Sequence, residues 1–309
     1  MKRLSGIGTA LVAASVGIGC SGNVVDREAV AAAAEDASSA TAVERLYVLD
    51  CGVGHAADQS RWSVGFDVGK PIDISVKCYL IRHKQGYFLW DTGISDHVAT
   101  MMPNGWLRGT NPATDITWRR AKTLMSQLKE INVTPADIKF IGISHSHPDH
   151  IGNLEQFPKT PVLIQKLEHD FFFDPKRSTA VPMLPPGDPM PEFKKDHPVQ
   201  LVEEDLDVFK DGSVMLFNTV GHTPGHQSLM VHLAKTGWVM LSGDAVHLKT
   251  NWDHKRVPYF FRLSVEEKLQ TAVSMQRMED LLALYRAQLW IVHDKAQSDA
   301  QKHAPAYYE

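Results

Sequence analysis

Apolar residues recur along most of the chain with the spacing of strands and of helices in turn. Residues 74–81 and 87–90 are rich in β-branched and aromatic side chains and flank Gln85-Gly86, which predicts a hairpin. Leu124, Leu128 and Ile131 have helical spacing, so a helix is expected over residues 118–131. A short strand is expected at residues 139–144 and a helix at residues 164–173.

The second half of the chain continues this alternation. Strands are expected at residues 214–220, 228–234, 238–242 and 289–292. Ser264 and Glu267 form a capping box, which predicts a helix from there to about residue 286. Its apolar side is expected to carry Leu269, Val273, Leu281 and Leu284. The order of elements predicts an α/β fold, in which segment 174–198, with seven prolines, forms a long irregular loop.

The first 42 residues differ in character from the rest. Lys2 and Arg3, followed by an apolar stretch too short to span a bilayer, predict a signal peptide over residues 1–20. Gly19-Cys20 resembles a bacterial lipoprotein cleavage site, so a lipidated Cys20 is expected to tether the protein to a membrane. Cleavage within residues 29–34 is the alternative. Residues 21–42 are interpreted as a flexible tether and residues 43–309 as one folded domain. Both routes predict an exported protein, which is periplasmic, an outer-membrane lipoprotein or secreted.

Composition and charge restrict the partners. The 309 residues carry a formal charge of −4, which becomes −6 once Lys2 and Arg3 are removed with the signal peptide, so nothing favours binding to nucleic acid. Besides Cys20, the chain contains Cys51 and Cys78. An exported protein can pair them. Each lies in an apolar, strand-like run, however, and this favours two buried free cysteines.

The densest group of chemically active side chains follows the strand expected at residues 139–144. Residues 144–150 read Ser-His-Ser-His-Pro-Asp-His, which places three imidazoles and a carboxylate within six positions. His145 and His147, one residue apart in an extended stretch, point the same way and can share a metal ion. The turn at Pro148 allows Asp149 and His150 to reach a second ion. Imidazole and carboxylate groups are ligands that zinc favours.

Three further groups of candidate ligands also follow expected strands. Residues 221–226 read Gly-His-Thr-Pro-Gly-His, residues 242–244 read Ser-Gly-Asp, and His293-Asp294 follows the last strand. The C-terminal ends of strands are where α/β folds gather their chemistry. One such group alone is more often structural than functional. Four of them in one chain predict a metal centre.

The order of these motifs resembles that of the metallo-β-lactamase superfamily, over a stretch from about residue 45 to the C-terminus. The resemblance implies an αβ/βα four-layer sandwich, with two central β-sheets flanked by helices and two zinc ions at one edge. In the family pattern the ligands would be His145, His147 and His222 for one zinc, Asp149, His150 and His293 for the other, and Asp244 as the bridge between them.

Within the superfamily, the sequence is more similar to N-acyl-homoserine lactone lactonases. The similar stretches are residues 66–73 (FDVGKPID), 76–81 (VKCYLI), 89–93 (LWDTG), 242–245 (SGDA) and 303–308 (HAPAYY). One position departs from the pattern. Many of these lactonases have a tyrosine three residues after the bridging aspartate, where it touches the substrate carbonyl, and here that residue is His247. An imidazole can also donate a hydrogen bond, so His247 is a candidate catalytic residue.

The resemblance implies hydrolysis of a lactone ring to an N-acyl-homoserine. A water ionised between two zinc ions would attack the carbonyl carbon, His247 would donate a hydrogen bond to the carbonyl oxygen, and Asp149 would return a proton to the leaving oxygen. Asp91 is the first candidate to orient a ligand, and Thr223 and His226 are weaker ones.

Several alternatives stay open. The substrate could be another ester or a thioester, although export disfavours a glutathione thioester. It could be a β-lactam, although β-lactamases generally lack a carboxylate ligand such as Asp244. A non-catalytic metal-binding or scaffolding protein is a third reading, and a homodimer is one option for the oligomeric state. Aromatic residues in loop-like regions are candidate walls of an acyl-chain pocket, with at least half of them expected in the core: Trp62, Phe66, Trp106, Trp252 and Phe260.

Overall fold

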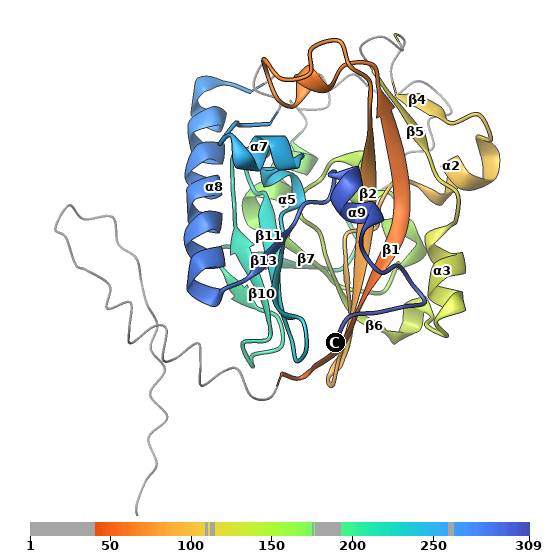
Figure 1. Cartoon of the computed structure of the whole chain (residues 1–309). Coiled ribbons are helices and arrows are strands. Elements are labelled where there is room, and N and C mark those ends of the chain that lie inside the picture. Colours follow the sequence, from red (N-terminus) through yellow and green to blue (C-terminus); the bar gives the residue numbers. More distant parts are fainter. Residues whose placement is uncertain (1–40, 109–110, 112–114, 175, 177–192, 259–262) are drawn as a thin grey trace, which may run out of the picture.

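The computed structural model describes residues 41–108, 111, 115–174, 176, 193–258 and 263–309. Within these residues, two β-sheets pack face to face and helices cover the outer faces (Figure 1). The predicted signal peptide with Cys20, nearly all of the tether, most of the Pro-rich segment, and Phe260 lie outside the described residues. No helix in the described part is long and apolar enough to cross a membrane.

The first sheet has eight strands in the order β4-β5-β1-β2-β3-β6-β7-β8. Their bounds are β1 Val43–Ala56, β2 Ile72–His83, β3 Gly86–Trp90, β4 Trp106–Arg108, β5 Ile116–Arg119, β6 Ile138–Gly142, β7 Val162–Gln165 and β8 Val199–Val202. The predicted hairpin is confirmed as β2 and β3, and the predicted strand at residues 139–144 as β6.

The second sheet has five strands in the order β13-β12-β11-β10-β9. Their bounds are β9 Leu206–Asp207, β10 Val214–Asn218, β11 Gln227–Leu233, β12 Gly237–Leu241 and β13 Gln288–Trp290. The described α-helices are α2 Asp96–Met101, α3 Leu124–Glu130, α4 Pro148–Ile151, α5 Lys166–Phe173, α7 Lys249–Asp253, α8 Val265–Tyr285 and α9 Lys295–Asp299. The short 3-10 helices are η1 Gln59–Arg61, η2 Pro135–Asp137, η3 Leu154–Gln156 and η4 Gly243–Ala245.

The alternation of side chains along β1 explains why the first sheet is buried on both faces. Leu46 and Val48 point into an apolar layer that also contains Leu229 and Val231 of β11, so this layer lies between the sheets. Tyr47, Leu49 and Cys51 point instead into a second apolar layer, which the first sheet shares with α3. A third layer joins the second sheet to α8. The predicted four-layer αβ/βα sandwich is thereby confirmed.

Strand direction brings the ends of several strands to one edge. β10 and β12 both run antiparallel to β11, and β13 runs parallel to β12, so these three strands point the same way. In the first sheet, β3, β6 and β7 are mutually parallel. The loops that follow β6, β10, β12 and β13 carry the four groups of candidate ligands.

The helix predicted over residues 118–131 was too long at its N-terminal end. Trp118 belongs to β5, where it lies opposite Gly54 of β1, and α3 begins only after its cap residue Thr123. A Cβ atom at Gly54 would lie 2.7 Å from the Trp118 ring, so tight packing against a glycine holds this tryptophan in the sheet. The helix predicted at residues 164–173 likewise begins at Lys166, because residues 162–165 form β7.

The apolar side predicted for α8 is wrong in the first half of the helix, whereas Leu281 packs against the core as predicted. The side chains of Leu269 and Val273 are 64% and 70% exposed, whereas the buried residues of the helix include Thr271 and Ser274. Ser274 Oγ donates to the carbonyl oxygen of Val220 at 2.6 Å. Small polar side chains let this helix approach the second sheet closely, and a hydrophobic period does not reveal such contacts.

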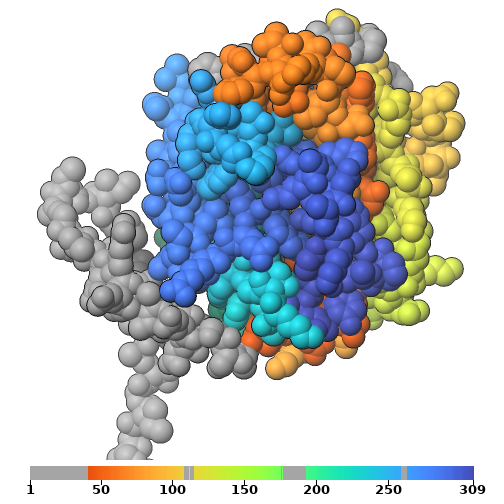
Figure 2. Space-filling model, in the orientation of Figure 1, coloured from red at the N-terminus to blue at the C-terminus, as the bar shows by residue number. Residues whose placement is uncertain are grey.

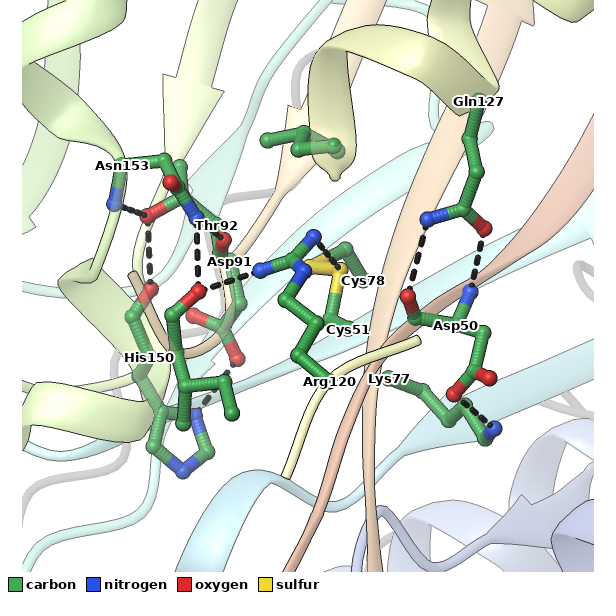
Figure 3. The surroundings of a disulfide bond; sticks show 12 residues. Asp50, Cys51, Lys77, Cys78, Asp91, Thr92, Arg120, Gln127, His150 and Asn153 are labelled. Atoms are coloured by element: carbon green, nitrogen blue, oxygen red, sulfur yellow. Dashed lines mark hydrogen bonds and ion pairs between the residues drawn. A yellow bond between two sulfur atoms is a disulfide. The ribbon is translucent and has the colours of Figure 1, made fainter. Parts of the chain in front are cut away.

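The expectation of two free cysteines is wrong as well. Cys51 and Cys78 form a disulfide that joins β1 to β2, with their Cα atoms 5.8 Å apart (Figure 3). Both residues are fully buried. An irregularity in the β1–β2 register between Asp50 and Gly52 displaces Cys51 toward its partner, and the sequence did not predict this bulge.

The C-terminal segment closes one side of the sandwich. Tyr308 pairs with Leu46 of β1 through two backbone hydrogen bonds of 2.9 Å, and Ala304 N donates to the carbonyl oxygen of Val48. Figure 2 shows this segment, in dark blue, spread over the face of the molecule next to α8. On the same face, the loop after β1 lies against α7, where Asn251 donates to the carbonyl oxygen of Trp62.

Candidate metal centre

Four loops at the shared sheet edge bring together all seven predicted ligands. His145, His147, Asp149 and His150 follow β6, with the last two on the short helix α4. The remaining three follow strands of the second sheet: His222 after β10, Asp244 after β12 and His293 after β13. The side chains form clusters whose ligand atoms all lie within 4.8 Å of one another. Side chains that are far apart in the sequence therefore lie together in one site.

The first cluster consists of His145, His147, His222 and Asp244. Nδ1 of His147 lies 2.9 Å from Nε2 of His145 and 3.0 Å from Nε2 of His222. Asp244 Oδ2 lies 3.6 Å from His145 Nε2 and 3.2 Å from His222 Nε2. Three ring nitrogens and one oxygen thus converge on a common centre, as a tetrahedral zinc site requires.

The second cluster consists of Asp149, His150 and His293. Asp149 Oδ2 lies 3.7 Å from His150 Nε2 and 3.6 Å from His293 Nε2. The other oxygen of Asp244, Oδ1, lies 3.1 Å from both of these imidazole nitrogens. Each oxygen of Asp244 therefore faces a different cluster, which is the geometry of a bridging carboxylate.

Two ligand atoms of the site have no hydrogen bond to another described residue. His150 Nε2 and Asp244 Oδ1 are buried, and neither makes a hydrogen bond in the described part of the chain. A buried polar atom without a hydrogen bond is costly, unless its lone pair serves another group such as a cation. His147 is only half-buried, unlike the other six residues, so the site opens on its side.

Burial and neighbouring charges shift the pKa values of the side chains in the site. Burial lowers the pKa of both His145 and His222 well below the usual histidine value, which keeps them neutral at pH 7. Burial would raise the pKa of Asp244, but the surrounding imidazoles, with His247 foremost, hold it well below the usual range. Burial also opposes the charged form of His150, yet the carboxylates of Asp244 and Asp91 raise the pKa of this imidazole. The site therefore pairs an ionised bridge with imidazole ligands.

Asp91 occupies the orienting position predicted for it. Its Oδ2 accepts from Nδ1 of His150 at 2.9 Å (Figure 3). Its Oδ1 accepts from the backbone N–H of Ser144 at 2.7 Å. The hydrogen bond from His150 leaves Nε2 of this ring to face the cluster. The residue adopts a φ of 56°, which turns its carboxylate from the end of β3 toward α4.

The two weaker orienting candidates differ in outcome. His226 Nε2 accepts from the backbone N–H of Asp244 at 2.8 Å, so this histidine fixes the chain at the bridging residue. Burial lowers its pKa to about 4, and the neutral ring can accept at Nε2 while Nδ1 donates to the carbonyl oxygen of Thr219. Thr223 is buried, but its hydroxyl makes no hydrogen bond to another described residue.

Two contacts to the site were missed by sequence reasoning. The backbone carbonyl of Ser75, in β2, accepts from Nδ1 of His293 at 2.7 Å and orients that ring. Glu168, in α5, accepts from Ser146, which stands between the first two histidines. A backbone carbonyl leaves no side-chain signal. Glu168 is the third residue of α5, in a first turn where an acidic side chain is ordinary.

His247 lies inside the site. Its Nε2 is 3.0 Å from Asp244 Oδ2, and its ring stacks on His293 with 5.1 Å between centroids. Burial lowers its pKa. The side chain that stands where the resemblance expects a tyrosine therefore lies beside the carboxylate of Asp244.

The four described candidate walls of an acyl pocket differ in burial. Trp62 and Trp106 are buried in the core. Phe66 and Trp252 are partly exposed, and Phe66 stacks on the His254 ring. Asp294, which follows His293, is the N-cap residue of α9. Its side chain accepts a 2.9 Å hydrogen bond from the backbone N–H of Gln297.

Comparisons with known proteins agree with this geometry. The N-acyl homoserine lactonase AttM of Azorhizobium caulinodans is 29% identical over 244 residues, which cover 78% of this chain and 90% of the relative. The lactonase AiiA of Bacillus thuringiensis subsp. kurstaki is 26% identical over 267 residues, which cover 86% of this chain and 99% of the relative. A solved N-acyl homoserine lactone hydrolase, with N-hexanoyl-L-homoserine bound at its catalytic metal center, aligns at a TM-score of 0.70 and 25% identity, covering 86% of this chain and 100% of that one.

The sequence model of the metallo-beta-lactamase superfamily matches residues 71–285, which is more than half of the chain. This stretch contains six of the seven predicted ligands, and the seventh, His293, follows it directly after β13. The chain therefore belongs to the metallo-beta-lactamase superfamily.

Proposed function

We propose that this protein is a two-zinc hydrolase that opens the ring of N-acyl-homoserine lactones, and so degrades quorum-sensing signals. The observation that carries the proposal is the position of Asp244. Its Oδ2 faces two histidines of the first cluster and its Oδ1 faces both histidines of the second, so one carboxylate can serve two cation sites. The names of the lactonase relatives supply the substrate class.

The charge of the site supports two divalent cations. Four buried carboxylates lie in or beside it: Asp91, Asp149, Glu168 and Asp244. A buried carboxylate needs hydrogen bonds or a counter-charge, and bound divalent cations would supply that charge to the carboxylates that face the two clusters. Imidazole and carboxylate ligands favour zinc over magnesium or calcium, which prefer oxygen.

In the proposed hydrolysis of a lactone, the bound cations, His247 and Asp149 have separate roles. The two cations, when bound, supply an ionised water at neutral pH and polarise the substrate carbonyl. His247, beside the bridging Asp244, is placed to donate a hydrogen bond to the carbonyl oxygen as negative charge develops there. Asp149, whose side chain is 11% exposed and faces the second cluster, would take up the proton released by the attacking water and pass it to the ring oxygen as that oxygen leaves.

The substrate assignment is tested by a panel assay on the purified mature protein loaded with zinc. Acid release is followed with short- and long-chain N-acyl-homoserine lactones, a cephalosporin and a thioester. Lactone opening alone is expected. Turnover of the cephalosporin or the thioester without any lactone opening would contradict the proposal and select one of the alternatives.

The metal assignment is tested separately by elemental analysis, which should find two zinc ions per chain. Asp244→Asn should lose zinc at both positions, because the bridge is shared. Asp253→Asn, which removes the same charge from an exposed side chain of α7, is the matched control and should retain both ions.

We further propose that the protein is exported and held at a membrane through a lipidated Cys20. The buried Cys51–Cys78 disulfide supports export, because such bonds persist in oxidising compartments and are rare in the cytosol. Mass analysis of the mature N-terminus tests the lipid. A diacylglycerol-modified Cys20 supports the tether, whereas cleavage within residues 29–34 leaves a soluble exported enzyme.

A further inference from the structure

We infer that Glu168 is a positioning residue that holds the two histidine loops of the first cluster in register. The inference rests on the proposed function, since it concerns how that cluster holds its cation. Glu168 is 1% exposed and lies in the first turn of α5, outside all of the ligand motifs. Its carboxylate contacts Ser146 and Gly225 rather than a candidate ligand, so it would act through the ligands.

The contacts of Glu168 join two loops that come from different sheets. Oε1 accepts from the backbone N–H of Ser146 at 2.8 Å and from its hydroxyl at 2.6 Å. Oε2 accepts from the backbone N–H of Gly225 at 3.1 Å. Ser146 separates His145 from His147, and Gly225 lies three residues after His222. One carboxylate thus spans the loops that carry all three histidines of the first cluster.

The packing around this link leaves little room for an alternative arrangement. A Cβ atom at Gly225 would lie 2.1 Å from the backbone nitrogen of Glu168 and 2.6 Å from its Cβ. The glycine therefore lets its loop lie directly against the N-terminal turn of α5. That turn favours a negative charge, and the three donors satisfy the buried oxygens.

The second cluster has its own supports. Asp91 orients His150 and the carbonyl of Ser75 orients His293, and neither contact involves Glu168. Loss of the Glu168 link should therefore affect one cation site more than the other. A residue that merely stabilised the fold would weaken both sites alike, and this difference makes a positioning role measurable.

The test is a titration of metal-free protein with Zn²⁺ in competition with a chromophoric chelator, which resolves two binding constants. Glu168→Gln keeps the shape, but its amide N–H₂ must face either the Ser146 donors or the Gly225 N–H. We expect one of the two zinc affinities to fall about 10- to 100-fold and the other to stay within about threefold. Asp170→Asn removes a charge from the exposed side of the same helix and should change neither constant.

Ser146→Ala is the milder variant, because it removes the 2.6 Å hydroxyl contact and keeps the backbone N–H. It should weaken the same zinc site by a smaller factor, even if Glu168→Gln does not fold. Unchanged affinities in every folded variant, or an equal loss at both sites, would overturn the positioning role. A wild-type protein that binds no zinc would refute the proposed function itself.

Discussion

Asp91, directly after β3, and His150, on α4, are joined by a 2.9 Å hydrogen bond between Oδ2 and Nδ1. The backbone of the same segment is tied to the same helix. Thr92 N donates to the carbonyl oxygen of His150 at 2.7 Å, and Asn153 Nδ2 donates to the carbonyl oxygens of Thr92 and Ile94 (Figure 3). Arg120 also donates to Ile94 O. A buried network thus fixes the orientation of one ligand of the second cluster.

Replacement of Asp91 by asparagine should weaken the second zinc site. Asparagine tolerates the positive φ of this position, so the backbone turn should persist while the carboxylate is lost. Loss of such an orienting partner typically lowers metal affinity 10- to 100-fold, and about that decrease is expected for one of the two binding constants. Competition titration with Zn²⁺ measures it.

The matched control for that variant is Asp67→Asn. Asp67 also has a positive φ, 48°, but it is exposed and pairs with Lys70 at the surface. Its substitution should leave both zinc affinities unchanged. Equal affinities in Asp91→Asn and the wild type would show that His150 does not depend on this carboxylate.

His226→Phe should destabilise the protein. The phenyl ring fills the site of the imidazole but cannot accept from the buried N–H of Asp244. A buried donor without a partner costs about 1–3 kcal/mol, which should appear as a lower midpoint in urea unfolding. His232→Phe is the control, because the ring of His232 stacks on Trp238 and a phenyl can do the same. A midpoint equal to that of the wild type would contradict the role of His226.

How far the sequence could predict this site depends on where each determinant lies. The seven ligands stand in short motifs after strands, so local pattern marked these groups as candidates, and the resemblance to the superfamily selected the seven from neighbours such as His226 and Asp294. Ser75 acts through its backbone carbonyl, and Glu168 acts across two sheets, so no local pattern distinguishes either. The same holds for the fold. The β2–β3 hairpin follows from alternation, whereas Trp118 is held in β5 by Gly54, a residue 64 positions away.

Removal of the Cys51–Cys78 disulfide should lower the free energy of unfolding. The two cysteines are 27 residues apart, and closing a loop of that length restricts the unfolded chain by about 3.5 kcal/mol. Cys51→Ala/Cys78→Ala should therefore unfold at lower urea concentration than the wild type. Adding a reductant to the urea series should shift the wild type toward the variant and leave the variant unchanged. Coincident unfolding curves for the wild type and the variant in the absence of reductant would contradict this expectation.

The same double variant should also affect the site. Cys51 O accepts from the backbone N–H of Ile94 at 3.3 Å, and a Cβ atom at Gly93 would lie 2.3 Å from that of Cys51. The disulfide thus supports the segment that begins with Asp91. We expect faster hydrogen exchange at residues 91–94 in the folded variant. Unchanged hydrogen exchange at these residues would show that the disulfide contributes to overall stability and not to the order of this segment.

His247 provides the sharpest test of the proposed mechanism, because here the chain departs from the lactonase pattern. Loss of a hydrogen-bond donor to a developing oxyanion typically lowers kcat 10²- to 10³-fold, so His247→Ala should lose activity on lactones by about that factor. His247→Tyr restores a donor at the same position and should recover part of it. Zinc content, measured on the same preparations, should remain at the wild-type value, since the seven other side chains complete both clusters. Wild-type turnover in both variants would remove His247 from the mechanism, whereas a loss of zinc in His247→Ala would make it a ligand instead of a donor.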